Sequence, residues 1–177
     1  MLETLISSKT RIKILLRFFL NPGVTAYLRG LAEEFDESTN SIRIELNRFE
    51  EAGMLISHNM GNKKVYQANS KHPLIKDLNS IILKYIGLDT IIDMVIERLG
   101  LLDRIYLTGD YAKGHDSGII DLVIIGEIDT AYLMNVVSRG EKIISRKLRF
   151  ITYNPLEWET LKNEVVGSEK YLLIWQK

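Results

Sequence analysis

The sequence contains no cysteine, only three prolines and no net charge. Without cysteine the chain cannot form disulfides, a zinc ribbon or a thiol nucleophile. Lys plus Arg equals Asp plus Glu, at 23 each, which excludes a grossly basic nucleic-acid binder but allows a local basic face. No apolar run approaches the length of a membrane span. The first twenty residues are interrupted by basic side chains and lack a cleavage site, so they are not a signal peptide. We therefore expect a soluble cytoplasmic protein with no membrane partner.

The chain does have enough apolar residues for a packed core, with 46% hydrophobic and 26% charged residues in 177 positions. This length suits one large domain or two small ones. The order of elements predicts a two-domain α+β or α/β protein. We expect a first domain over residues 1–72, linker and dimerisation helices over 73–100, and a second, α/β domain over 101–177.

Three helices and a hairpin are predicted in the first 72 residues. Apolar spacing places the helices over residues 10–20, 27–35 and 39–52. Thr10 can cap the first helix, Ser38 or Thr39 can cap the third, and Gly53 ends the third in the C′ position. Two strand-like runs, MLISHN and KVYQAN, then surround a glycine turn and predict a β-hairpin with a basic tip.

Two helices joined by a tight turn form a helix-turn-helix, whose second helix can enter the major groove of DNA. On that helix Ile42, Leu46 and Phe49 face the core, which leaves polar residues outside. Asn can bind adenine and Arg can bind guanine through two hydrogen bonds, while lysines at the hairpin tip can neutralise phosphates. The candidate DNA contacts are Ser38, Thr39, Asn40, Ser41, Arg43, Asn47, Arg48, Asn62, Lys63 and Lys64. An ordinary solvated helix face gives the same pattern, and Ile44 and Glu45 are not typical base readers.

Two runs of residues carry a family resemblance here. The third helix closes with Leu46-x-x-Phe49-Glu50-Glu51-Ala52-Gly53-Met54-Leu55, and the hairpin reads Gly61-Asn62-x-x-x-Tyr66-x-Ala68-Asn69. Residues 8–72 resemble the winged helix-turn-helix of the ArsR-like bacterial transcription regulators. The resemblance implies binding of double-stranded DNA. The metal-sensing cysteines of some such regulators are absent, so it does not imply metal sensing.

The linker region, residues 73–100, has two amphipathic segments. The first begins near Pro73 and is interrupted by Gly87, and the second runs from about Asp89 to Leu99. Their apolar stripes must be buried, either within one monomer or against the same helices of a second copy. Two-fold dimers are the commonest oligomers and suit paired DNA half-sites. We favour a homodimer, and packing within one monomer is the alternative.

The second domain alternates strands and helices. Strands are predicted over 104–108, 119–125 and 147–153, and helices over 110–114, 131–145 and from Pro155, with a further strand or helix end near 171–175. The runs Leu107-Thr108-Gly109-Asp110-Tyr111-Ala112-Lys113-Gly114 and Gly118-Ile119-Ile120-Asp121-Leu122, with RKLRFITYNPLEW at 146–158, resemble the minimal nucleotidyltransferase fold. The resemblance spans residues 88–175. It implies a nucleotide pocket at Gly109, Asp110, Lys113 and Asp121.

The chemistry of that family needs carboxylates that this chain lacks. Nucleotide transfer uses Mg²⁺, which takes oxygen ligands. The family supplies two acids one residue apart and usually a third on a neighbouring strand. Here Ile119 takes the place of the first acid, and the segment around Arg149 offers none. We therefore predict no catalytic residues, no metal and no cofactor, and expect Asp121 to bind a backbone group or a Lys or Arg side chain.

Other residues near this pocket leave alternatives open. Asp110 stands where the family serine would help bind phosphate, and its carboxylate would repel phosphate while accepting hydrogen bonds from helix N–H groups. His115 and Asp116 could assist a metal, although loop residues of this kind are more often only solvated. A basic cluster could bind an anion without magnesium or could be ordinary surface; it consists of Arg139, Lys142, Arg146, Lys147 and Arg149.

Three functions are compatible with these patterns. The favoured one is a homodimeric DNA-binding transcription regulator whose inactive second domain serves dimerisation, protein contacts or the sensing of an unknown small-molecule or protein effector. The second is an active nucleotidyltransferase that its winged helix guides to a protein or nucleic acid. The third is an antitoxin-like partner of a toxin–antitoxin pair.

Overall fold

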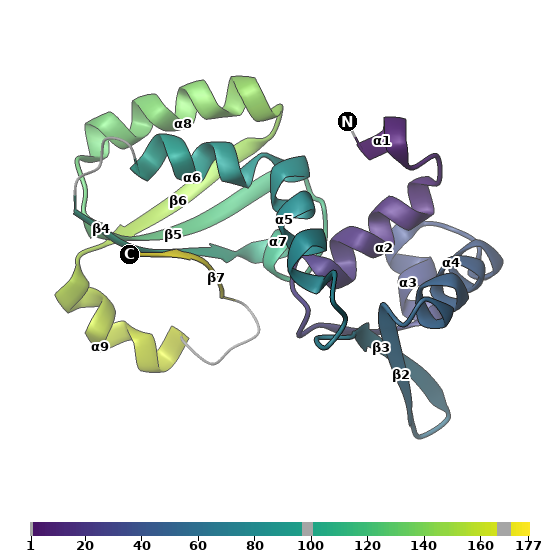
Figure 1. The fold of residues 1–177 in the computed structure, drawn as a ribbon. Coiled ribbons are helices and arrows are strands. Elements are labelled where there is room, and N and C mark those ends of the chain that lie inside the picture. The colour runs from purple at the N-terminus through teal and green to yellow at the C-terminus, as the bar shows by residue number, and fades with distance from the viewer. Residues whose placement is uncertain (1, 97–100, 166–170) are drawn as a thin grey trace. The chain divides into compact units, whose positions relative to one another are not determined.

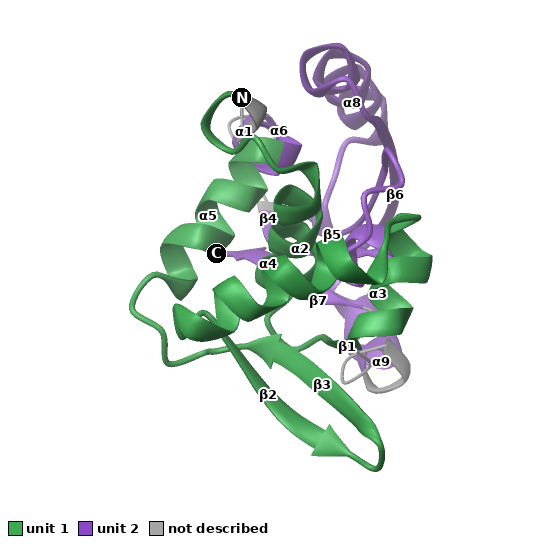
Figure 2. Cartoon of the chain, turned by 90° about the vertical axis from the view of Figure 1, so that its right-hand side faces the viewer, with its two compact units in different colours: residues 1–85 green, residues 86–177 purple. Residues whose placement is uncertain are grey.

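The structure is a computed structural model that describes residues 2–96, 101–165 and 171–177. The chain divides into two compact units, residues 1–85 (unit 1) and 86–177 (unit 2), which Figure 2 shows in different colours. Each unit combines helices with one sheet. The division falls inside the segment that the sequence marks as a linker. None of the described helices is long and apolar enough to cross a membrane.

Unit 1 contains helices and a small antiparallel sheet. Its elements are α1 (Leu2–Leu5), α2 (Lys9–Phe19), β1 (Thr25–Tyr27), α3 (Leu28–Phe35), α4 (Thr39–Glu51), β2 (Leu55–Met60), β3 (Lys63–Ala68) and α5 (Ile75–Ile86). The sheet order is β1-β3-β2. Strand β1 was not predicted, because its three residues lack a recognisable alternation; pairing of Tyr27 with Val65 on β3 defines it. The β2–β3 hairpin, the wing, extends away from the helices (Figure 2).

The helix ends follow from local hydrogen bonds. The backbone N–H of Ser41 donates to Ser38 Oγ at 3.1 Å, so Ser38, one of the two predicted candidates, is the cap of α4. Gly53 follows α4 with a φ of 68°, a left-handed conformation that glycine adopts without strain. The prediction that Thr10 caps α2 is wrong. The cap is Ser8, which accepts from the N–H of Arg11, because α2 begins earlier and the Thr10 hydroxyl donates to Glu37 instead.

The core of unit 1 joins α2, α3 and α4. Their largest fully buried side chains are Ile14, Phe18, Phe19, Leu31, Ile42 and Leu46. The rings of Phe19 and Phe49 pack with centroids 5.9 Å apart. Helix α5 is tied to this core because the amide of Asn79 donates to the carbonyl oxygens of Phe19 and Leu20, at 2.8 and 3.0 Å. These carbonyls lie at the C-terminal end of α2, where no helix N–H is available to donate a hydrogen bond to them.

Unit 2 is a four-stranded mixed sheet with helices on both faces (Figure 1). Its elements are α6 (Leu88–Ile96), β4 (Leu101–Thr108), α7 (Gly109–Ala112), β5 (Ile119–Glu127), α8 (Thr130–Ile144), β6 (Lys147–Tyr153), α9 (Pro155–Val165) and β7 (Leu172–Gln176). The strand order is β6-β5-β4-β7, with β5 and β6 parallel and the other pairs antiparallel. Gly87 separates α5 from α6, as predicted, with a φ of 84°. The predicted end of the second linker helix, residues 97–99, lies outside the described residues.

Helices α6 and α8 lie on one face of the sheet and α9 on the other (Figure 1). On the α9 face Trp158 is 1% exposed and packs against the rings of Tyr106 and Tyr153, with centroids 5.1 and 6.0 Å away. Val123 of β5 belongs to the same cluster. Because side chains alternate along a strand, Asp121 points to this face as well, nearer the start of β5.

Candidate nucleic-acid interface

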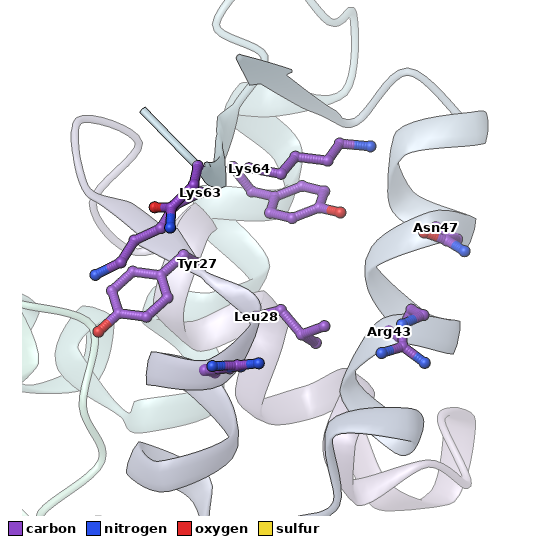
Figure 3. Close-up of a pocket in the computed structure, with 9 residues that line it drawn as sticks. Tyr27, Leu28, Arg43, Asn47, Lys63 and Lys64 are labelled. Carbon is purple, nitrogen blue, oxygen red and sulfur yellow. The ribbon is translucent and has the colours of Figure 1, made fainter. Parts of the chain in front are cut away.

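A groove of about 510 Å³ runs between the helix-turn-helix and the wing of unit 1 (Figure 3). The end of β1, helices α3 and α4 and the wing supply its walls, which consist of Tyr27, Leu28, Arg29, Arg43, Asn47, Asn62, Lys63, Lys64 and Tyr66. Four of these side chains are cationic. Among the described residues that line it, none carries a carboxylate. The groove is therefore a positively charged, hydrogen-bonding surface.

Helix α4 presents two of these residues because its opposite side is fixed in the core. Ile42 and Leu46 are fully buried and Phe49 is 7% exposed. Arg43 and Asn47 are exposed and one turn apart, so they share a face of the helix. Figure 3 shows both side chains on the groove side of α4. Both side chains can therefore reach a ligand in the groove.

Lys63 is held at the opposite wall by an aromatic ring. Its Nζ lies 4.3 Å from the ring centroid of Tyr27, a cation–π contact (Figure 3). Tyr27 lies at the end of β1, and its ring packs so closely on α3 that a Cβ at Gly30 would lie 3.1 Å from it. The positive charge of Lys63 therefore has a defined place.

Lys64 differs from Lys63 because its charge is already paired with a carboxylate. Its Nζ donates to Glu50 Oε2 of α4 at 2.7 Å, and the Ser57 hydroxyl of β2 donates to Glu50 Oε1 at 2.5 Å. The hydrogen bonds from Lys64 and Ser57 lower the pKa of Glu50, and the bond to Glu50 raises the pKa of Lys64. Lys64 therefore links the wing to α4 as well as lining the groove.

Glu45 is the buried charged residue that anchors α4. It is 5% exposed and accepts from Arg11 Nε at 2.8 Å, Arg11 Nη2 at 3.2 Å and Arg48 Nη1 at 3.2 Å. Burial would raise the pKa of Glu45, but the hydrogen bonds from Arg11 and Ser8 and the charges of Arg11 and Arg48 outweigh it, so the pKa is lowered. This network fixes α4 against α2.

The predicted DNA contacts thus fall into two groups. Arg43, Asn47, Asn62, Lys63 and Lys64 line the groove. Ser38, Thr39, Asn40 and Ser41 are exposed at the start of α4, where Ser38 caps the helix, and Arg48 is exposed but paired with Glu45. Sequence reasoning missed Arg29, Tyr27 and Tyr66. The basic side chain on the exposed face of α3 could have indicated Arg29, but the tyrosines depend on β1 and the wing pairing.

In unit 2 one residue of the predicted nucleotide pocket, Asp121, forms an ion pair. Arg149 stands opposite Asp121 in the β5–β6 register, and donates from Nε to Oδ1 at 2.6 Å and from Nη2 to Oδ2 at 2.9 Å. The bond to Asp121 raises the pKa of Arg149. The prediction that Asp121 binds a backbone group or a Lys or Arg side chain is confirmed. Gly109, with a φ of 67°, lies so close that a Cβ there would be 2.3 Å from Asp121 Oδ2.

The loop after α7 is fixed by a second polar cluster. Tyr111 is fully buried and its hydroxyl donates to Asp116 Oδ1, while Arg146 donates to the Tyr111 oxygen at 2.7 Å and to Asp116 Oδ2 at 2.9 Å. Burial would raise the pKa of Asp116, but the bonds from Arg146 and Tyr111 lower it. The Asp116 carboxylate therefore holds the loop to the start of β6. Among described residues, no three His, Asp or Glu side chains form a metal-binding group.

The other two pocket residues are on the surface. Lys113 is exposed. Asp110 is exposed as well, and the residue at the N-cap position of α7 is Thr108. Helix α7 has only four residues and starts after Thr108, so Asp110 lies inside its first turn rather than ahead of it. The charge of Asp110 contributes to the raised pKa of Arg149.

No family model matches the chain, and no curated protein matches it. Solved structures similar to parts of it include reduced HlyU from Vibrio cholerae N16961, at 15% identity and a TM-score of 0.38, over 49% of this chain and 83% of that one. A toxin–antitoxin MntA–HpeT mutant has 13% identity and a TM-score of 0.39, over 50% and 72%. A "putative nucleotidyltransferase" from Sulfolobus solfataricus has 24% identity and a TM-score of 0.37, over 54% and 80%. Similarities at this level do not assign a function.

Proposed function

We propose that the protein is a transcription regulator that binds double-stranded DNA through unit 1. The groove between α4 and the wing is the observation that carries this proposal. It gathers Arg29, Arg43 and Lys63 around hydrogen-bonding amides, with no carboxylate among its described lining residues. A polyanion is the ligand that such a surface attracts.

The arrangement of side chains suits a duplex in particular. Arg43 and Asn47 project from the exposed face of α4, and these residue types make paired hydrogen bonds to guanine and adenine in the major groove. Lys63 and Asn62 lie at the wing tip, where backbone phosphates or the adjacent minor groove would be reached. Base contacts and phosphate contacts would thus come from different elements.

We further propose that the regulator acts as a homodimer and that unit 2 serves protein contacts or sensing rather than phosphoryl transfer. Leu74 and Ile81, two helical turns apart in and just before α5, are 47% and 42% exposed, which supports a helix surface that a second copy covers. The pairing of Asp121 with Arg149 supports a degenerate nucleotide site, because the remaining carboxylate is already neutralised. Light scattering across a dilution series measures the oligomeric state.

Electrophoretic mobility shift of the full chain on random and upstream duplexes tests the central proposal. We expect binding whose affinity falls steeply as salt rises, because phosphate contacts release counterions. Arg43→Ala combined with Lys63→Ala should weaken binding strongly, and Lys142→Ala on α8, which should leave binding unchanged, is the control. Absence of binding at low salt overturns the proposal. Co-purification of a protein partner that covers α4 would instead support the antitoxin-like alternative.

A further inference from the structure

Helix α4 carries an exposed isoleucine where its polar face is most remote from the core. Ile44 is 45% exposed, while its neighbours Ile42 and Leu46 are fully buried. Asn40, Ile44 and Asn47 follow one another at spacings of four and three residues, so they form one stripe along the helix. Ile44 is the middle member of this stripe.

A single exposed apolar residue is common on protein surfaces, so exposure alone carries no meaning. The position of Ile44 on α4, in contrast, is informative. It sits between two exposed amides, beside Arg43, on the helix that lines the basic groove. Within residues 39–47 of α4 the sole acid is Glu45, which is buried and paired with Arg11. The part of this face up to Asn47 therefore has charge and hydrogen-bonding groups that fit nucleic acid, and the exposed Glu51 lies on the same stripe one turn further along the helix.

The major groove offers one apolar feature to such a side chain. Thymine projects its C5-methyl group there, whereas the other bases present hydrogen-bonding groups at their edges. Contact with that methyl removes apolar area from water on both partners. The amides of Asn40 and Asn47, on either side of Ile44, can bind adenine, which occurs in every pair that contains thymine.

We propose that Ile44 is a specificity-determining residue that reads a thymine by packing on its C5-methyl group. The proposal rests on the proposed function, since it requires α4 to lie in the major groove. The inference about Ile44 adds two points to the proposed function. It names a chemical ligand, the thymine methyl, and it predicts a preference for an A·T pair at the base step that faces the middle of the α4 stripe.

The experiment uses the full chain and duplexes enriched from a random library by rounds of binding. Each thymine of the enriched half-site is replaced in turn by deoxyuridine, which lacks only the methyl group. We expect one replacement to weaken binding about three- to tenfold, as the loss of one buried methyl implies. Ile44→Ala should weaken binding to the thymine duplex by a similar factor and make the protein indifferent to the replacement.

Ile143→Ala, at an isoleucine that is 62% exposed on α8, is the matched control and should keep the full sensitivity to deoxyuridine. Thermal melting by circular dichroism checks that the Ile44→Ala protein is folded, and Ile44→Val, which keeps a branched side chain, should retain the sensitivity. Salt-dependent binding with no sensitive thymine, or an Ile44→Ala protein that stays sensitive, overturns this inference alone. Lack of binding to every duplex overturns it together with the proposed function.

Discussion

Arg149, on the neighbouring strand, donates a hydrogen bond to each carboxylate oxygen of Asp121, with N–O distances of 2.6 and 2.9 Å. The sheet register places the two residues directly opposite each other. The strand beside Asp121, on which the resemblance to nucleotidyltransferases leads one to expect a further acid, thus presents a guanidinium to that carboxylate. Because the pair has no net charge, it offers little to attract a divalent cation.

The first prediction concerns nucleotide transfer. The purified chain, incubated with labelled nucleoside triphosphates and Mg²⁺ or Mn²⁺, should label neither itself nor an added protein or nucleic acid. Arg149→Ala should not restore transfer, because a single carboxylate remains. Both Arg149→Ala and Asp121→Asn should change stability little, since Arg149 is 67% exposed and solvent screens the pair. Metal-dependent labelling that disappears in Asp121→Asn would falsify the proposal of an inactive domain.

The second prediction concerns the glycine beside that ion pair. Gly109→Ala should destabilise unit 2 by about 2–4 kcal/mol, because the position has a positive φ and the new Cβ would overlap Asp121 Oδ2. Gly118→Ala is the matched control, with a φ of 75° and nothing within 4 Å of its Cβ. It should cost only the conformational part, about 1 kcal/mol. Denaturant titrations followed by Trp fluorescence measure both; equal losses would show that Asp121 yields without cost.

The sequence predicted much of this fold because its helices have clear apolar faces and its strands are bounded by glycine. Glycine at position 53 and serine at position 38 correctly marked the ends of α4. It did not reveal β1, since a three-residue strand is defined by its partner β3 rather than by its own pattern. The sequence also indicates Thr10 as a cap, because a hydroxyl near a helix start is a local signal, whereas its partner Glu37 is remote in sequence.

The candidate site was predictable only in part for the same reason. Periodicity placed Arg43 and Asn47 outside the core, and the glycine turn placed Lys63 and Lys64 at the wing. Periodicity does not show which cations are paired. The bond of Lys64 to Glu50 forms because the wing packs beside α4, which the sequence does not show. The bond of Arg48 to Glu45 depends on the direction in which the two side chains of α4 point. In the sequence all these cations are equally good candidates for DNA contacts, whereas the structure shows that Lys64 and Arg48 are paired with carboxylates.

The third prediction concerns base readout. Arg43→Ala and Asn47→Ala should each weaken binding to the preferred duplex by about 1–3 kcal/mol and relax the preference at one base position. Neither should weaken binding to random DNA by the same amount. Competition assays with preferred and random duplexes measure the difference. Equal losses of affinity on all duplexes would mean that these side chains contact phosphates. No loss on any duplex would mean that an element other than α4 lies in the major groove of the DNA.

The fourth prediction separates the two lysines of the wing. Lys63→Ala should weaken binding to every duplex alike and reduce the slope of log affinity against log salt by about one. Lys64→Ala should change that slope less, because its charge is already neutralised by Glu50 at 2.7 Å. Binding is measured from low to moderate salt on one random duplex. A larger slope change for Lys64→Ala would show that DNA draws Lys64 away from Glu50.

The last prediction concerns the anchor of α4 and its dependence on pH. The pKa of Glu45 is lowered in the folded chain from its ordinary value of 4.5. A group whose pKa is lowered on folding adds stability above its unfolded pKa and loses it as pH falls through its folded pKa. Stability of unit 1 should therefore decline in acid from about pH 4.5 downward, and Glu45→Gln should remove this component.

At neutral pH Glu45→Gln should cost unit 1 about 1–3 kcal/mol, because charge-assisted bonds from Arg11 are lost. Glu51→Gln, exposed on the same helix, is the matched control and should change little. Hydrogen exchange of the α2 and α4 amides measures the effect. The fluorescence of Trp158 and Trp175 reports unit 2 and should not change. An acid response in the α4 amides that Glu45→Gln leaves intact would assign the titration to another carboxylate, such as Glu37, whose pKa is also lowered.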